Sequence, residues 1–180
     1  MDQHADYIEP VKRWVEEVVV GFNFCPFAKA ELDRTRYTVS YGQKAKQVLK
    51  DFETEIDYLQ STPEIANTLL ILARGFADFH RYLDLVAQAD ACLDKQGLRG
   101  QFQLASFHPH YQFDGEPAND PSNYTNRAPL PVLHLLRESE VEKAISHYRQ
   151  PENIPRRNIA KARALGSEHL QEKLDHCLRR

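Results

Sequence analysis

The sequence predicts an α/β protein: a layered sandwich in which helices pack on a small mixed sheet of three to four strands, followed by a helical C-terminal tail. Short apolar runs that suit strands alternate along the chain with longer segments whose apolar residues recur every three or four positions. The length of 180 residues suits a single domain, 1–180, of which residues 151–180 form a helical extension. An α+β arrangement is the alternative, because the sequence does not reveal the strand order.

The alternation is clear in the first half of the chain. Apolar residues at helical spacing predict a helix over 5–20, which Gly21 would end. Apolar and polar residues alternate over 36–41, as in a half-exposed edge strand. A second amphipathic helix follows over 43–60. The continuous apolar run 68–73 predicts a strand that is covered on both faces.

The second half repeats the pattern and ends in helices. A helix capped by Asp78 runs to about residue 95, and a strand follows over 102–107. The apolar run 130–136 is a further strand or a short buried helix, and the strand is favoured. Ser139 and Glu142 form a capping box that would open a helix to about residue 148.

The tail reads as one long helix, from Pro155 to Leu178, bent at Gly166. A stretch without periodicity separates the last two predicted strands, over about residues 108–129. Loops this long inside a compact domain are usually functional or disordered. Its aromatic residues predict a packed loop, which makes it the first place to expect a site.

Composition and charge argue against several classes of protein. No run approaches the ~20 apolar residues that span a bilayer, and the first residues are acidic and polar, unlike a signal peptide. We therefore expect a cytoplasmic protein without a membrane partner. Residues 1–155 carry a net charge of −7 and residues 156–180 one of +4. A basic tail without aromatic residues is a poor footprint for nucleic acid, which is not an expected partner. The oligomeric state stays open, a homo-oligomer included.

The three cysteines, Cys25, Cys92 and Cys177, are far apart and odd in number, so free thiols in a reducing compartment are expected. Cys25 lies among three phenylalanines and just before Pro26, where a helix start would favour its thiolate. Residue chemistry leaves two interpretations open. Cys25 is a small buried hydrophobe, or it is a nucleophile with a histidine across the site as base.

Histidines are the next candidates. His108 and His110 face the same way in an extended segment, so they could chelate one metal ion with Asp114 or His134 as a third ligand. Alternatively, one lies on the surface and the other bonds a loop carbonyl. His134 is either a satisfied core residue or, pointing away from its leucine neighbours, a proton donor or acceptor at the loop.

A polar set near the loop could hold an anionic or carboxylate-bearing ligand, because arginine offers a bidentate fork. The set comprises Asn123, Asn126, Arg127 and Arg137. The asparagines alternatively satisfy the backbone of the loop. Arg74 is a further candidate, since open α/β sheets bind ligands outside the carboxyl ends of their strands.

Common cofactor and hydrolase motifs are absent. The sequence contains no Gly-x-Gly-x-x-Gly, no phosphate loop, no Gly-x-Ser-x-Gly and no His-Glu-x-x-His. Nucleotide binding by the common loops is therefore disfavoured. The cofactor, if one is used, stays unknown, and no metal ligands are assigned.

Five ordered motifs cover nearly the whole chain: Asn23-Phe24-Cys25-Pro26-Phe27, Ser106-Phe107-His108-Pro109, Tyr111-Gln112-Phe113, Asn123-Tyr124-Thr125-Asn126-Arg127 and Leu133-His134-Leu135-Leu136-Arg137. Together they resemble a bacterial family of uncharacterised proteins, catalogued only as a domain of unknown function. The resemblance names no reaction. It implies that Cys25, His108, His134, Arg127 and Arg137 belong to the family's pattern. The position of His110 often holds another polar residue in similar proteins, which weakens the metal site and strengthens Cys25.

The leading functional hypothesis is a small-molecule enzyme whose pocket lies between the 108–130 loop and the Asn23–Phe27 segment. Cys25 would be a nucleophile or redox thiol, with His134 or His108 as acid or base. A negative group of the substrate would be held by the polar set and Arg74, above all by Arg127 and Arg137. The alternatives are a non-catalytic module that binds a metabolite or a protein, and a histidine metal site.

Overall fold

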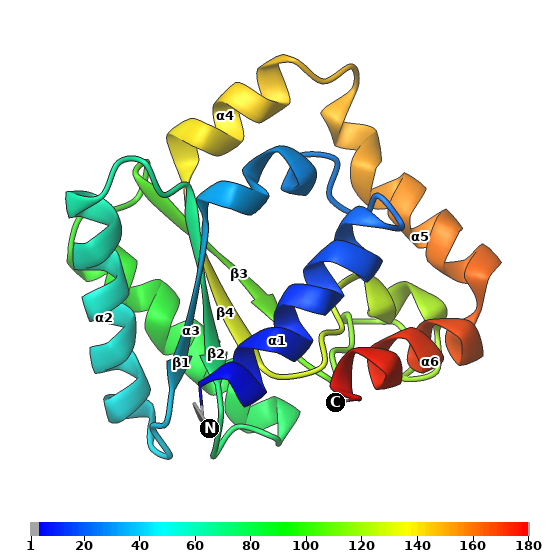
Figure 1. Ribbon diagram of the computed structural model, residues 1–180, viewed down its shortest axis with the longest axis horizontal. Helices are drawn as coiled ribbons and strands as arrows, with labels where there is room; N and C mark the ends of the chain where they lie inside the picture. Colours follow the sequence, from blue (N-terminus) through cyan, green and yellow to red (C-terminus); the bar gives the residue numbers. More distant parts are fainter. Residues whose placement is uncertain (1–3, 180) are drawn as a thin grey trace.

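The computed structural model describes residues 4–179 and has helices on both faces of a four-stranded mixed sheet (Figure 1). The strands are β1 (Thr35–Ser40), β2 (Asn67–Leu72), β3 (Phe102–Phe107) and β4 (Val132–Arg137). Their order is β1-β2-β4-β3, with β1 parallel to β2 and β4 antiparallel to both of its neighbours. The predicted α/β sandwich is confirmed, and each predicted strand lies within two residues of an observed one.

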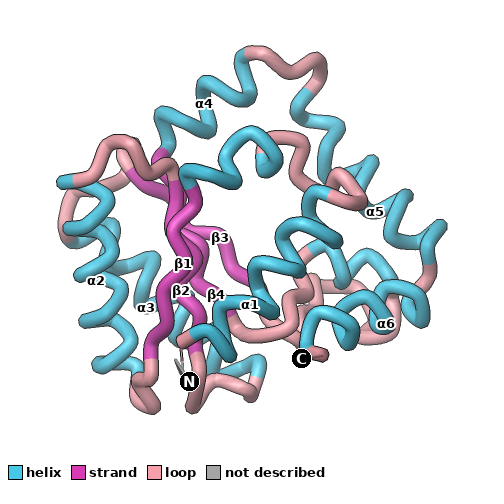
Figure 2. The backbone as a smooth tube through the Cα atoms, in the orientation of Figure 1, coloured by secondary structure: helices cyan, strands magenta, loops and turns pink. Residues whose placement is uncertain are grey.

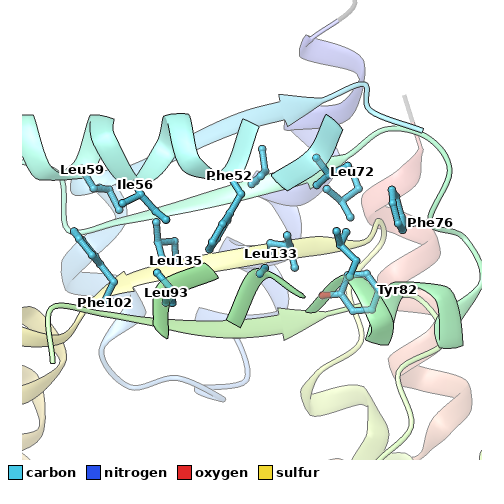
Figure 3. Packing of buried hydrophobic residues seen from close by; sticks show 14 of the residues in the cluster. Phe52, Ile56, Leu59, Leu72, Phe76, Tyr82, Leu93, Phe102, Leu133 and Leu135 are labelled. Atoms are coloured by element: carbon cyan, nitrogen blue, oxygen red, sulfur yellow. The ribbon is translucent and has the colours of Figure 1, made fainter. Parts of the chain in front are cut away.

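One face of the sheet is covered by α2 (Ala45–Ser61) and α3 (Phe79–Lys95), which lie side by side in Figures 1 and 2. Strand residues of even number in β2 and odd number in β4 point to this side, so Leu70, Leu133 and Leu135 meet Phe52 and Ile56 of α2 (Figure 3). Phe52 and Ile56 are fully buried. Truncating a buried phenylalanine such as Phe52 to alanine typically costs about 3–5 kcal/mol of stability.

The opposite face carries a second core. It is built under α1 (Ala5–Trp14), η1 (Val15–Val20), α5 (Ile154–Leu165) and α6 (Ser167–Leu178). Ala162, Leu170 and Leu174 of the last two helices are buried there beside Trp14 and Val18. Residues 154–178 thus belong to the second core and pack beside α1, η1 and η3 on this side of the sheet (Figure 1).

The first helix changes its winding before it ends. In η1, backbone hydrogen bonds join residues that are five apart, for example the Gly21 N–H and the Glu16 carbonyl at 3.0 Å. This pattern makes a wider, π-helical turn. Gly21 follows with helical backbone angles, and a side chain there would collide with the carbonyl of Glu17. The left-handed residue that redirects the chain is Asn23, at φ 53°. Asparagine is among the few non-glycine residues that tolerate this conformation.

Shorter segments complete the chain: η2 (Ala28–Arg34), η3 (Pro121–Thr125), α4 (Glu138–Ser146) and η4 (Pro151–Asn153). The predicted capping box of α4 does not form. The chain passes straight from β4 into the helix, Arg137 occupies the cap position, and no side chain caps it. The long C-terminal helix is broken rather than bent, because Gly166 adopts φ +82° between α5 and α6.

Among residues 4–179, no helix is both long enough and apolar enough to cross a membrane.

Candidate functional site

A cavity of about 300 Å³ lies on the face of the sheet that is covered by α1 and η1. We call it the sheet-face cavity. Its walls come from η1, from residues 25–31 and from α4. Its floor consists of strand residues that point to this face: Thr35, Asn67, Leu69, Gln103, Ala105, Phe107, His134 and Leu136. Most lining side chains are apolar, so the cavity suits a small organic molecule.

Two of the predicted catalytic residues, Cys25 and His134, line this cavity together. His134 stands in the middle of β4, paired in register with Leu69 of β2 and Ala105 of β3. Because side chains alternate along a strand, its imidazole points away from the core that receives Leu133 and Leu135. The sequence had left a core role and a loop-facing role open for His134. It borders the cavity instead.

A relay of hydrogen bonds fixes the tautomer of His134. The Thr35 hydroxyl donates to the Glu31 carbonyl at 2.7 Å, so its oxygen accepts from the Asn67 amide N–H at 3.1 Å. That leaves the Asn67 carbonyl oxygen to accept from Nε2–H of His134 at 3.0 Å. The proton of the imidazole therefore sits on Nε2. Nδ1 carries a lone pair and has no hydrogen-bond partner among residues 4–179.

The imidazole of His134 is uncharged at neutral pH. Burial lowers its pKa to about 4, since a protonated ring would have little solvation there. A neutral ring of fixed tautomer is a directional hydrogen-bond acceptor at Nδ1 and a weak base.

The thiol of Cys25 is uncharged as well. Burial raises its pKa, and the backbone N–H groups of Phe27 and Ala28 act in the opposite direction to a smaller extent. At neutral pH the cavity is thus lined by a protonated Cys25 thiol and a neutral His134 imidazole, not by a thiolate–imidazolium pair.

A hydrogen-bond donor is also buried at this cavity. Trp14 lines the wall and is 2% exposed, yet its indole N–H has no partner among the described residues. Unpaired buried donors are uncommon in native proteins because each one costs about 1–3 kcal/mol. The lining of the cavity therefore includes a residue with an unpaired donor, Trp14, as well as His134 with its unpaired acceptor.

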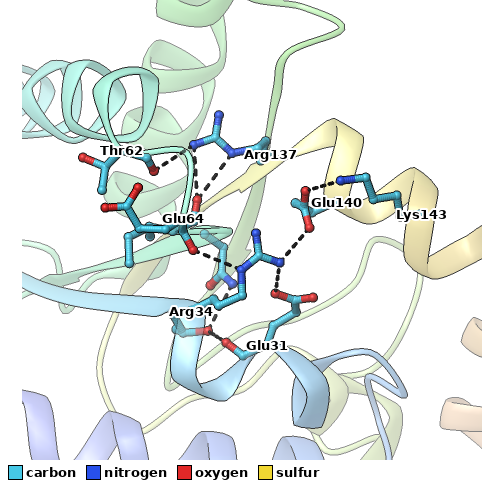
Figure 4. A network of polar contacts seen from close by, with 10 residues as sticks. Glu31, Arg34, Thr62, Glu64, Arg137, Glu140 and Lys143 are labelled. Atoms are coloured by element: carbon cyan, nitrogen blue, oxygen red, sulfur yellow. Dashed lines mark hydrogen bonds and ion pairs between the residues drawn. The ribbon is translucent and has the colours of Figure 1, made fainter.

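Charged residues at the cavity mouth hold α4 in place (Figure 4). Arg34 bonds the carboxylates of Glu31 at 3.1 Å and Glu140 at 2.8 Å, and Lys143 bonds Glu140 at 2.8 Å. Arg34 and Lys143 lower the pKa of Glu140 to about 2. Glu31 and Glu140 line the cavity, whereas α4 contributes no buried residue to either core.

The two arginines expected to hold a substrate are already engaged by the backbone. Arg137 lines the cavity, but its guanidinium donates to the carbonyls of Leu59, Thr62 and Ile65 (Figure 4). Arg127 lies outside it and donates to the carbonyls of Tyr111 and Ala118. Both arginines therefore serve to hold the chain together.

The remaining members of the predicted polar set lie elsewhere. Asn123 is fully buried and bonds the backbone of Phe113 and Pro117, so it braces the long loop. Asn126 lines a second cavity, described below. Arg74 is exposed beyond the opposite end of β2, over the ring of Tyr41. None of the three lines the sheet-face cavity.

His108 lies apart from Cys25 and packs against Phe79 and Tyr82 of α3. It is fully buried, and both of its ring nitrogens are engaged. Nδ1 accepts from the His110 backbone N–H at 3.0 Å, so Nε2 donates to the Phe76 carbonyl at 3.0 Å. This is the loop-carbonyl role that the sequence had left open. Residues 4–179 contain no group of three histidine, cysteine or acidic side chains placed to hold a metal ion.

The sequence reasoning missed Asn67, Thr35 and Trp14. Asn67 immediately precedes the apolar run of β2, and its polar side chain at the head of a buried strand was the available signal. Thr35 and Trp14 gave none, because a threonine in a strand and a tryptophan on an amphipathic helix are both common core-facing residues.

Comparison with known proteins yields one match. A family model described as "Protein of unknown function (DUF1415)" matches residues 6–172. No curated protein and no solved structure matches the chain.

Proposed function

Since the chain belongs to the DUF1415 family of proteins of unknown function, its role has to be inferred from the site, and we propose that it binds a small, uncharged organic molecule in the sheet-face cavity. The ligand is largely apolar and carries a hydroxyl or amide group. The size of the cavity and its apolar walls support this proposal.

The lone pair of His134 Nδ1 is the observation that carries the proposal. A relay through Thr35 and Asn67 holds this ring in one tautomer, and the ring borders an apolar cavity. A core histidine without a ligand would normally have both nitrogens satisfied, as His108 does. A hydroxyl or amide can donate to Nδ1, and the same group can accept from a donor such as the Trp14 N–H.

Charge favours an uncharged ligand over the anionic substrate that the sequence suggested. The only guanidinium among the described lining residues, that of Arg137, is taken up by three carbonyls. Glu31 and Glu140 also line the cavity, and their pairing with Arg34 and Lys143 leaves neither of these two cations free for an anion.

A second candidate is an enzyme that uses Cys25, and it is favoured because the thiol lines the same cavity as His134. In its first step the sulfur would bond a carbonyl carbon of the ligand. The π electron pair of that carbonyl would move to its oxygen, and the thiol proton would pass to Nδ1 of His134. The raised pKa of Cys25 and the lowered pKa of His134 in the empty cavity make this the weaker proposal.

We test the binding proposal with 2-phenylethanol and ethylbenzene, which differ by one hydroxyl, against the wild-type protein and H134L. NMR-detected titration should show that the wild type gains about fivefold in affinity from the hydroxyl relative to H134L, the value of one neutral hydrogen bond. H80L is the control, because His80 is exposed on α3, on the opposite face of the sheet. The same hydroxyl preference in all three proteins would exclude His134 as the acceptor.

We also propose a cytoplasmic location. The support is that Cys25, Cys92 and Cys177 are all free thiols, as is usual in a reducing compartment.

A further inference from the structure

A second cavity, of about 520 Å³, lies between α5, the 113–126 loop and Phe24. We call it the α5 cavity. Val19, Cys25 and Phe107 line both cavities, so the two share a wall that includes the thiol. The apolar part of the α5 cavity comes from Phe24, Phe107, Phe113, Ile154, Pro155 and Ile159.

Two asparagines in the lining of the α5 cavity donate an amide N–H to a backbone carbonyl. Asn158 donates its amide N–H to the Phe24 carbonyl, and its Oδ1 is buried without a partner among the described residues. Asn126 donates to the Ser106 carbonyl at 3.2 Å. The Thr125 hydroxyl has one proton and gives it to the Ser122 carbonyl at 2.9 Å, so it leaves Asn126 Oδ1, at 3.4 Å, without a close donor.

Ser122 adds another unpaired oxygen. It lines the α5 cavity and is 1% exposed; its hydroxyl faces the Asp120 carboxylate and helps to lower the pKa of that group, while its Oγ accepts no hydrogen bond among residues 4–179. Asn158 is 8% exposed, so each of these side chains is more than nine-tenths buried. Buried polar atoms of this kind usually have a partner, and both of these lie in the wall of one cavity.

The charge of the α5 cavity has one sign. Asp114 and Glu116 line it, and no lysine, arginine or histidine is among its described lining residues. Arg163 pairs with Glu116 at 3.1 Å from outside the lining, whereas Asp114 has no ion-pair partner among the described residues. Asp114 is exposed at the surface, where a cation would first meet the protein.

We propose that the α5 cavity is a second binding site, which takes a cationic ligand with several N–H donors on an apolar body. A primary ammonium, amidinium or guanidinium group would donate to the oxygens of Asn126, Asn158 and Ser122. Asp114 attracts its charge, and the aromatic and proline side chains hold the apolar body. This site is independent of the ligand proposed for the sheet-face cavity.

The test uses 2-phenylethylamine, a cation at neutral pH, and 2-phenylethanol as its uncharged analogue. The amine should bind more tightly in the α5 cavity and shift the backbone amide resonances of residues 122–126 and 158–159. D114N should weaken amine binding about threefold. D84N is the matched control, because it removes the same charge from an exposed position on α3, across the sheet.

Two further variants separate the cavities and the contacts. E31Q removes a carboxylate from the sheet-face cavity and should leave amine affinity unchanged. S122A keeps the hydrogen bonds that the backbone of Ser122 makes in η3 and should weaken amine binding about tenfold. Loss of binding in E31Q but not in D114N would overturn the proposal. An amine that binds no better than the alcohol in the α5 cavity, as judged from the resonances of residues 122–126 and 158–159, or that binds equally well to wild type, D114N and S122A, would overturn it too.

Discussion

His134 of β4 and Asn67 of β2 are joined by a hydrogen bond of 3.0 Å at the floor of the sheet-face cavity. The two residues are diagonal neighbours in the sheet, since His134 pairs in register with Leu69 and Asn67 with Leu136. The bond holds a neutral imidazole with its unprotonated nitrogen free, and it turns an inconspicuous asparagine into the residue that orients the site.

The lowered pKa of His134 makes stability depend on pH. The unfolded chain takes up a proton near pH 6.5 and the folded protein near pH 4, so stability falls as the pH drops through this window. A shift of this size is worth about 3 kcal/mol. The H134Q variant keeps an amide N–H for Asn67 but cannot titrate. Urea denaturation from pH 7 to pH 4 should show the wild type losing about 3 kcal/mol more than H134Q. Parallel curves would show that the ring titrates normally.

The relay makes the tautomer of His134 sensitive to a residue that does not contact it. In T35V the Asn67 amide loses the oxygen that orients it, so it can turn and donate to His134 Nε2. ¹⁵N NMR should then detect His134 as a mixture of tautomers, at a cost of about 1 kcal/mol of stability. T54V is a matched control, because Thr54 also donates to the carbonyl four residues earlier, on the exposed side of α2. An unchanged tautomer in T35V would contradict the relay.

Cys25 should react slowly with alkylating reagents at neutral pH. Burial raises the pKa of its thiol, and only the thiolate is a good nucleophile. The rate of iodoacetamide labelling, followed at the Cys25 peptide by mass spectrometry, should rise with a midpoint above ~8.5. C25A identifies the peptide. A midpoint below 7 would instead support the enzyme that uses Cys25.

The Glu140 carboxylate should control the mobility of α4. This helix has no buried residue, and Arg34 ties it to η2 through Glu140 (Figure 4). In E140Q we expect hydrogen exchange over residues 138–146 to speed up about tenfold, with global stability changed by less than about 1 kcal/mol. D94N is the comparison, because it weakens the exposed pair with Arg99 that bridges no second element. Equal protection of α4 in both variants would show that other contacts hold it.

Periodicity predicted most of the fold, because the strands and helices differ clearly in the spacing of their apolar residues. The strand over Phe102–Phe107 was placed at its observed bounds, whereas at Gly166 a bend was predicted and the helix is broken there. The Ser139–Glu142 capping box failed because the local pattern cannot tell whether the preceding strand runs directly into the helix. The order of β4 between β2 and β3 depends on long-range pairing, which no local pattern contains.

The site was partly visible in the sequence. Cys25 and His134 stood out as reactive residue types in apolar surroundings, and they line one cavity. Arg127 and Arg137 were expected to be free for a substrate, yet both bond backbone carbonyls. The hydrogen-bond partner of a side chain depends on the tertiary structure, which the sequence does not show. The role of Asn67 was missed for the same reason.

The most direct measurement is the ¹⁵N chemical shift of His134 Nδ1 during titration with 2-phenylethanol and, separately, ethylbenzene. The alcohol should move the Nδ1 resonance by donating a hydrogen bond to its lone pair, while Nε2 stays bound to Asn67 and its resonance barely changes. Ethylbenzene should leave both resonances in place. An Nδ1 resonance that ignores the alcohol, or that responds equally to both compounds, would contradict the assignment of His134 as the ligand's hydrogen-bond acceptor.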